Sequence, residues 1–118
     1  MEKKTVLIID DDTAISGFLY EMLLSDGFEV SCCDDGMPAL ELAKEKCFDV
    51  VITDYRMSGM DGVEITKSLR LRCPGSFIVG ISAECQGKNF IDAGADAFLK
   101  KPFPIKDLIS IIIKKPAV

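Results

Sequence analysis

Five short apolar segments, separated by segments with helical periodicity, constrain the fold of this chain more than any other feature. They have the length and the β-branched content of strands, and they are Thr5–Ile9, Phe28–Cys33, Val50–Thr53, Phe77–Ile81 and Ala97–Leu99. Three of them contain continuous apolar runs rather than alternating ones. Continuous runs are typical of strands that are buried on both faces of a parallel sheet.

Helical patterns follow each of these segments. The periodic residues are Ile15, Phe18, Leu19, Met22 and Leu23; Ala39, Leu40, Leu42 and Ala43; Val63, Ile65, Thr66 and Leu69; a short polar stretch, Lys88–Ala93; and Ile105, Leu108, Ile109 and Ile112. Gly27, Pro74 and Gly94 are placed to end three helices, and the last helix is expected to end near Lys115. Five strand–helix units in succession predict an α/β protein with a doubly wound parallel sheet and right-handed crossovers.

The length and hydropathy of the chain predict a single domain. A chain of 118 residues corresponds to one domain, which we place at residues 1–118. The apolar runs fall far short of the ~20 residues that span a bilayer, and no basic-then-apolar leader is present at the N-terminus. We therefore expect a cytoplasmic protein that does not contact a membrane.

Charge, histidine and cysteine content exclude several classes of function. The net charge is −5, which argues against direct nucleic-acid binding. The chain has no histidine, so Ser-His-Asp catalysis, Cys-His catalysis and His-containing zinc sites are excluded. Its five cysteines form no C-x-x-C spacing, so we expect neither a disulfide framework nor a zinc ribbon, but buried thiols in a reducing compartment.

Polar residues follow four of the predicted strands. Asp10, Asp11 and Asp12 follow the first strand, Asp54 follows the third, Ser82 ends the fourth, and Lys101-Pro102 follows the fifth. Carboxyl ends of parallel strands meet at one edge of the sheet, where ligands bind in this architecture. Each residue taken alone has an ordinary explanation as a helix cap, a turn or a solvated charge. Their joint placement favours a functional site.

The chemistry of that edge is specific. Clustered carboxylates repel one another until a cation or a proton relieves them, and oxygen ligands without histidine or cysteine select a hard cation such as Mg²⁺. A lysine and a serine would contact further oxygens of a phosphoryl group, and a carboxylate can accept that group as an acyl phosphate. The edge therefore fits reversible phosphorylation of an aspartate.

Four segments resemble the receiver domain of two-component response regulators, and the similarity covers essentially the whole chain. They are Leu7–Asp12, Val51–Gly62, Gly80–Ala83 and Phe98–Phe103. The resemblance implies a flavodoxin-like (βα)5 fold with a five-stranded sheet in the order 2-1-3-4-5.

The resemblance also implies roles for individual residues. Asp54 resembles the phosphoacceptor. Asp10 and Asp11 resemble the acidic pair that holds Mg²⁺, with Asp11 the more direct ligand, joined by Asp54 and the backbone carbonyl of Arg56. Ser82 matches the switch hydroxyl, Lys101 the phosphate-facing lysine, in a cis peptide with Pro102, and Phe98 the switch aromatic. One departure from the family is Met57-Ser58 where the family has Met-Pro, which predicts more backbone freedom in that loop and no effect on the chemistry.

The partners follow from the same resemblance. A sensor histidine kinase or a histidine phosphotransferase would donate the phosphoryl group. Ser82 would then move toward it and Phe98 would rotate into the vacated space. The face formed by the fourth helix, the fifth strand and the fifth helix would thereby be remodelled for a downstream protein, an output domain or a second copy of the chain.

Two local hypotheses go beyond the family. Arg56 lies two residues past Asp54, and Glu84 lies two residues past Ser82. An ion pair between Arg56 and Glu84 would hinder water from reaching the acyl phosphate. The alternative is that both side chains are solvated. Ile111 and Ile113 extend the apolar surface of the last helix, which indicates a docking or dimer surface; the alternative is packing of the chain end.

Two other functions fit parts of the pattern. Ile8–Thr13 partly resembles the nucleophile motif of haloacid dehalogenase-like phosphatases, with Asp10 as nucleophile and Asp12 as acid/base. Against that enzyme, the motif's threonine position holds Ala14, the chain is short, and Asp54 would have no role. A receiver-like module that no longer accepts phosphate is disfavoured, because the five residues that the chemistry requires are all present: Asp10, Asp11, Asp54, Ser82 and Lys101.

Overall fold

The structure is a computed structural model that describes residues 3–57 and 59–113, and it confirms the predicted α/β architecture. The elements are β1 (Thr5–Ile9), α1 (Thr13–Ser25), β2 (Glu29–Cys33), α2 (Gly36–Glu45), β3 (Val50–Asp54), α3 (Gly62–Arg72), β4 (Phe77–Ser82), α4 (Gly87–Ala93), β5 (Ala97–Lys100) and α5 (Ile105–Ile113). All strand pairs are parallel and the sheet order is β2-β1-β3-β4-β5. The predicted strand order is confirmed.

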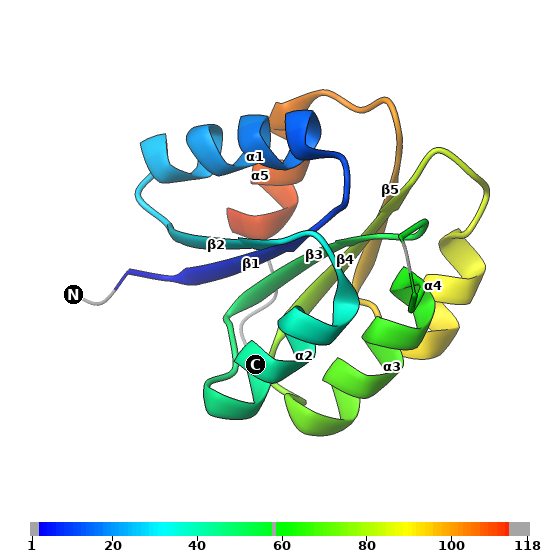
Figure 1. Cartoon of the computed structure of the whole chain (residues 1–118). Coiled ribbons are helices and arrows are strands. Elements are labelled where there is room, and N and C mark those ends of the chain that lie inside the picture. Colours follow the sequence, from blue (N-terminus) through cyan, green and yellow to red (C-terminus); the bar gives the residue numbers. More distant parts are fainter. Residues whose placement is uncertain (1–2, 58, 114–118) are drawn as a thin grey trace.

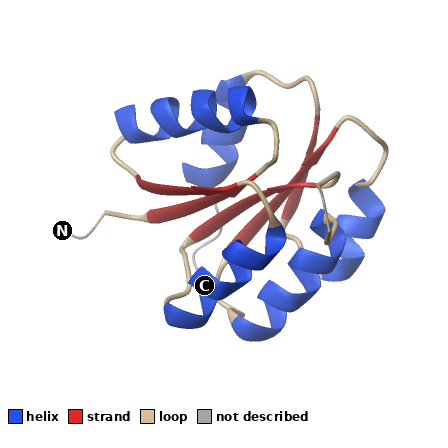
Figure 2. Cartoon of the chain, in the orientation of Figure 1, coloured by secondary structure: helices blue, strands red, loops and turns tan. Residues whose placement is uncertain are grey.

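Helices cover both faces of the sheet. Helices α1 and α5 lie on one face, and α2, α3 and α4 lie on the other (Figures 1 and 2). Successive residues of a strand point to opposite faces, so Val6 and Ile8 pack into the core beneath α1 and α5, whereas Leu7 and Ile9 pack into the core beneath α2, α3 and α4. This double burial is the physical reason for the continuous apolar runs in the sequence.

The helix ends follow local chemistry. The Asp12 carboxylate caps α1 by accepting hydrogen bonds from the amides of Ala14 and Ile15 at 3.0 and 3.3 Å. Asp61 and Glu64 form a capping box at the start of α3. Gly94 ends α4 at φ 114°, a left-handed conformation that favours glycine. The predicted end of the last helix, near Lys115, lies outside the described residues.

Two side chains on the α1–α5 side depart from the expected pattern. The spacing of Phe18 places it on the apolar face of α1, but its side chain is 55% exposed. Ile111, which we expected on a docking surface, packs against the core beneath α1 and α5, and Ile113 is exposed. The apolar surface of α5 is therefore smaller than the sequence pattern indicates.

The prediction for the cysteines is wrong. Cys47 and Cys73 form a disulfide, Cys32 and Cys85 are exposed free thiols, and Cys33 is half-buried. The spacing of 26 residues between the bonded pair corresponds to no short motif, because the crossover through β3 and α3 brings the two residues together.

Within the described residues, no helix is both long enough and apolar enough to cross a membrane.

Candidate functional site

The loops at the carboxyl edge of the sheet bring the predicted site residues together. Asp10 directly follows β1 and is 1% exposed, and Asp54 ends β3 and is 8% exposed. These strands are direct neighbours in the sheet, so the two carboxylates lie side by side. The backbone amide of Asp12 donates to Asp10 Oδ1 at 2.9 Å, which holds the Asp10 carboxylate in place.

Lys101 joins the two buried carboxylates. Its Nζ lies 3.4 Å from Asp10 Oδ2 and 3.3 Å from Asp54 Oδ1. The backbone positions this lysine, because the amide of Lys101 donates to Ser82 O at 2.8 Å and the Lys101-Pro102 peptide is cis, as predicted. The ammonium group is therefore held between the Asp10 and Asp54 carboxylates.

The electrostatics of the buried pair are unfavourable in the absence of a cation. The pKa of Asp10 is raised from 3.8 to about 6, chiefly because the carboxylate is buried. The nearby charge of Asp54 acts in the same direction, and the Asp12 amide and Lys101 act in the opposite direction. A site in which two carboxylates share one lysine attracts additional positive charge.

The donor set fits a divalent hard cation. Asp10, Asp11 and Asp54 each offer a carboxylate oxygen, and these oxygens all lie within 4.8 Å of one another. All three are oxygen ligands, and Asp11 is exposed, so water can complete an octahedral shell as Mg²⁺ requires. The three carboxylates predicted from the sequence are therefore close enough to share one ion.

Asp12, the third acidic residue of the run, has a different role. Its carboxylate is exposed and accepts the hydrogen bonds that cap α1. The phosphatase alternative assigns this carboxylate an acid/base role, whereas in the structure its Oδ1 atom caps α1.

Ser82 lies at the end of β4, and its side chain is 2% exposed. The amide of Glu84 donates to Ser82 Oγ at 2.9 Å, which couples the hydroxyl to the β4–α4 loop. Movement of the hydroxyl would therefore carry this loop with it.

A row of aromatic rings connects the β3–α3 loop with β5. Tyr55 packs edge-on against Phe90 with ring centroids 6.3 Å apart, and Phe90 packs against Phe98 at 5.7 Å. The Phe90 ring fills space over Gly80 and Gly62, where a Cβ would collide with it. Sequence reasoning identified Phe98 but missed Phe90; the two glycines, one in a strand and one at a helix start, were the available signal.

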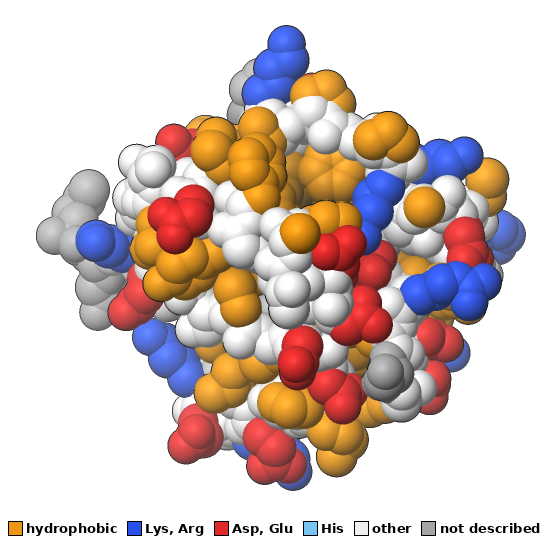
Figure 3. Space-filling model, turned by 45° about the horizontal axis from the view of Figure 1, so that its top comes forward, with side chains coloured by type: hydrophobic (Ala, Val, Ile, Leu, Met, Phe, Trp, Pro, Cys, Tyr) orange, Lys and Arg blue, Asp and Glu red, His pale blue; other side chains and the backbone are white. Residues whose placement is uncertain are grey.

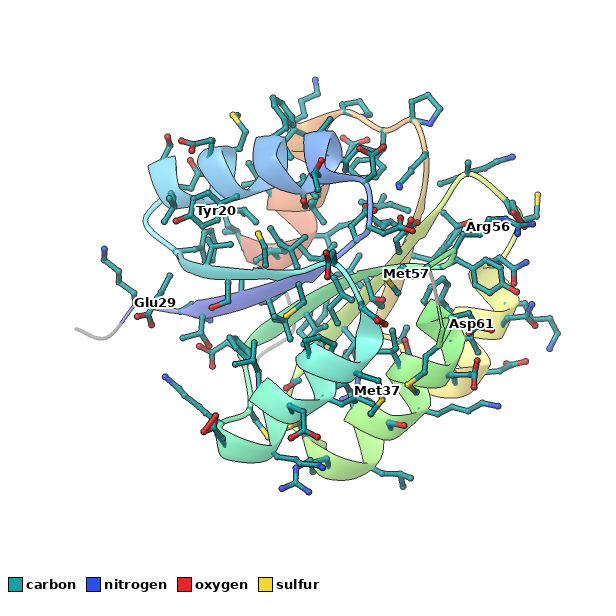
Figure 4. All side chains as sticks on the ribbon, in the orientation of Figure 1. Tyr20, Glu29, Met37, Arg56, Met57 and Asp61 are labelled. Atoms are coloured by element: carbon teal, nitrogen blue, oxygen red, sulfur yellow. A yellow bond between two sulfur atoms is a disulfide. The ribbon has the colours of Figure 1, made fainter. Side chains whose placement is uncertain are left out.

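An ion pair between Arg56 and Glu84 bridges the β3–α3 and β4–α4 loops, as predicted from their positions. The hydrogen bond to Glu84, and then its charge, raise the pKa of Arg56 above its usual value. Arg56 lies at the carboxyl edge of the sheet together with Met57 (Figure 4). Ser58, where the family has proline, lies outside the described residues.

An apolar pocket of about 370 Å³ adjoins the acidic cluster. Phe18 and Ile15 of α1 line one side, Pro102 and Phe103 line the other, and Lys101 lies where the pocket meets the site. Figure 3 shows the hollow among hydrophobic side chains beside the acidic groups. The exposure of Phe18 is explained by this pocket, which was not foreseen from the sequence.

A parallel five-stranded sheet in this order, with carboxylates, a lysine and a hydroxyl at its carboxyl edge, defines a class of signalling domains. The model of the response regulator receiver domain family matches residues 6–113. The chain therefore belongs to the receiver domain family of two-component signalling.

Curated relatives support this assignment. The chain is 31% identical over 106 residues to the transcriptional regulatory protein TctD of Salmonella typhimurium, an alignment that covers 87% of the chain and 47% of TctD. It is 32% identical over 108 residues to the response regulator MprA of Mycobacterium sp., which covers 89% of the chain and 47% of MprA. The chain thus spans about half the length of the curated relatives it matches.

Solved structures show the same fold. A CheY-like receiver domain protein from Methanospirillum hungatei aligns with a TM-score of 0.91 at 28% identity, covering 97% of this chain and 94% of that one. The chemotaxis response regulator CheY4 of Vibrio cholerae aligns with a TM-score of 0.88 at 29% identity, covering 96% and 98%.

Proposed function

We propose that Asp54 accepts a phosphoryl group in a Mg²⁺-dependent reaction and that the chain acts as a signalling switch rather than as an enzyme that turns over a substrate. The observation that carries this proposal is the convergence of the Asp10, Asp11 and Asp54 carboxylates, with Lys101 Nζ within 3.4 Å of both buried ones. A capping or purely structural role for Asp54 would not require this arrangement.

The reaction is an in-line displacement on phosphorus. A carboxylate oxygen of Asp54 attacks the phosphorus atom, the N–P bond of a phosphohistidine breaks, and its electron pair remains on the imidazole nitrogen. Lys101 neutralises charge that develops on a phosphoryl oxygen. Asp10, Asp11, Asp54 and the backbone carbonyl of Arg56 would hold Mg²⁺, which when bound supplies positive charge to the phosphoryl oxygens.

The phosphoryl group then changes the contacts of Ser82. Its hydroxyl donates to a phosphoryl oxygen, and the β4–α4 loop follows through the hydrogen bond between the Glu84 amide and Ser82 Oγ. Phe98 is half-buried beside Gly87 at the start of α4, so rotation of its ring is coupled to the position of that helix. The α4–β5–α5 face is the surface that changes on phosphorylation.

The donor is a sensor histidine kinase or a histidine phosphotransferase. Its phosphohistidine must reach Asp54, so the donor covers the surface around the site, including the apolar pocket that Lys101 and Phe18 line. Downstream, the changed face binds a protein partner, an output domain or a second copy of the chain, rather than nucleic acid. We place this activity in one receiver domain at residues 1–118, in the cytoplasm.

The test is intact-mass measurement after incubation with Mg²⁺ and acetyl phosphate. One added phosphoryl group is expected on the wild-type chain, none on Asp54→Asn, and none when Mg²⁺ is chelated. Asp34→Asn, which changes an exposed carboxylate outside the cluster, serves as the matched control and should be modified normally.

Two results would reject the proposal. Steady release of inorganic phosphate that depends on Asp10 and survives Asp54→Asn would indicate a phosphatase. An unmodified wild-type chain would indicate a module that binds partners without accepting phosphate.

A further inference from the structure

The disulfide lies at the opposite edge of the sheet from the candidate site. Cys47 is in the connection between α2 and β3, and Cys73 is the residue that ends α3. Their Cα atoms are 5.7 Å apart. The bond therefore joins the segment that enters β3 to the far end of the helix that follows it.

The covalent loop contains the whole unit that carries the acceptor. Residues 47–73 include β3 with Asp54 at its end, the β3–α3 loop and α3. At the site end, the amide of Gly62 donates to Tyr55 O at 2.9 Å, and Gly62 packs so closely on the Asp54 carbonyl that a Cβ would collide with it. Helix α3 is thus attached to β3 at both ends, by backbone contacts at one and by the disulfide at the other.

The two sulfur atoms differ in their access to solvent. Cys73 is 2% exposed and packs in the core beneath α2, α3 and α4 with Leu69 and Ile78. Cys47 is exposed and lines a depression of about 340 Å³. An external thiol can therefore reach the disulfide of the folded protein at Cys47.

We propose that the Cys47–Cys73 pair is a reversible thiol–disulfide switch, exchanged at Cys47 by a low-molecular-weight thiol of the glutathione type, and that it sets the rigidity of the β3–α3 unit. A thiolate attacks Cys47 Sγ, the S–S bond breaks, and Cys73 leaves with the electron pair and takes a proton from solvent. A second thiolate attacks the mixed disulfide, which releases Cys47 and one molecule of oxidised thiol. Two external thiols are oxidised as the protein disulfide is reduced.

The consequence for signalling rests on the proposed function. The closed loop restricts α3 relative to β3, so the backbone around Asp54 is more rigidly held in the oxidised form. The oxidised form should accept a phosphoryl group from acetyl phosphate at least about twofold faster than the reduced form.

The experiment isolates the pair in a variant that carries Cys32→Ser, Cys33→Ser and Cys85→Ser. The folded protein is equilibrated with defined ratios of reduced and oxidised glutathione. Free thiols are then alkylated, and the intact mass is measured. We expect full exchange without unfolding, an unfolding midpoint on the order of 10 °C higher for the oxidised form, and slower amide exchange in α3. Addition of Cys47→Ser, a change at an exposed side chain, should abolish all three redox effects.

Several results would overturn the proposal. Alkylation of the pair only after denaturation would show a structural disulfide that external thiols do not reach. A pair that stays reduced in oxidised glutathione would not be a disulfide switch. Equal phosphorylation rates in the two forms would remove the coupling to Asp54. Absence of phosphorylation in both forms, with the redox shift in unfolding intact, would instead reject the proposed function and leave the exchange established.

Discussion

Burial changes the protonation equilibrium of a single residue, Asp10. Its carboxylate is fully enclosed, lies next to Asp54, and has one lysine to share with it. The raised pKa means that the metal-free folded protein holds a proton on Asp10 that the unfolded chain releases at lower pH. The stability of the metal-free protein should therefore depend on pH in a direction opposite to that of most buried, paired carboxylates.

We predict that the free energy of unfolding of the metal-free protein falls between about pH 4 and pH 6. The folded pKa of about 6 lies above the usual 3.8, so the contribution of Asp10 is fully present below pH 3.8 and is lost as the pH rises through the folded pKa. Relative to Asp10→Asn, the loss should be on the order of 3 kcal/mol. Urea unfolding at several pH values measures it. An identical pH profile in Asp10→Asn would contradict the prediction, and excess Mg²⁺ should flatten the wild-type profile.

The ion pair between Arg56 and Glu84 is a second feature that depends on single side chains. An exposed ion pair contributes little to stability, so the bridge to Glu84 matters for what it covers. We predict that Arg56→Ala shortens the lifetime of phosphorylated Asp54 several-fold, because water gains access to the acyl phosphate. The lifetime is measured by intact mass after removal of acetyl phosphate. Lys88→Ala, which breaks a similar exposed pair with Asp92 on α4, is the matched control. An unchanged lifetime in Arg56→Ala would refute this gate.

At the scale of elements, α1 presents a face that its periodicity does not explain. Leu19 and Leu23 are buried as the pattern predicts, whereas Phe18 lines the pocket beside Lys101. A large apolar side chain at the rim of a charged site is suited to contact an approaching protein. Phosphorylation of Asp54 by acetyl phosphate and phosphorylation by a protein donor should therefore differ in how strongly they depend on Phe18.

We predict that Phe18→Ala slows transfer from a phosphorylated histidine phosphotransferase by about tenfold and leaves modification by acetyl phosphate unchanged. Only the protein donor covers the pocket. The two rates are compared by mass spectrometry under the same Mg²⁺ concentration. Leu24→Ala removes another exposed side chain of the same helix, 40% exposed near its C-terminal end, and should affect neither rate. Equal slowing of both routes by Phe18→Ala would show damage to the site itself.

At the scale of the whole molecule, the exposed apolar surface available for the proposed partner contact is smaller than the sequence indicates. Ile111 packs inward, and the exposed large apolar side chains of α4 and α5 are Ile91 and Ile113, at 48% and 63% exposure. A second copy of the chain would have to form its interface around these residues after the α4–β5–α5 face has changed.

We predict a monomer in the unmodified state and self-association in the presence of Mg²⁺ and a phosphoryl mimic such as beryllofluoride. Ile91→Ser should abolish the association, and Leu71→Ser, a change at a leucine of α3 that is 87% exposed, should not. Sedimentation velocity distinguishes the two states. A monomer under both conditions would remove the second copy from the set of partners.

Much of the fold and most of the site could be predicted because the signals are local. Continuous apolar runs such as Val6–Ile9 arise from burial on both faces of the sheet, and a residue that directly follows a strand must lie at the carboxyl edge. Asp10, Asp54, Ser82 and Lys101 therefore meet without any knowledge of side-chain packing. Even the ion pair between Arg56 and Glu84 follows from two neighbouring strands and an equal offset from their ends.

The sequence by itself determined the number and order of the elements, the parallel sheet and the edge that carries the acidic cluster, since these depend on periodicity and strand ends. Only the tertiary structure decided the disulfide between Cys47 and Cys73, the fit of Phe90 over Gly62 and Gly80, the exposure of Phe18 and the burial that raises the pKa of Asp10. Each of these depends on how residues far apart in the chain are packed by the crossover connections, and no local pattern in the sequence records that packing.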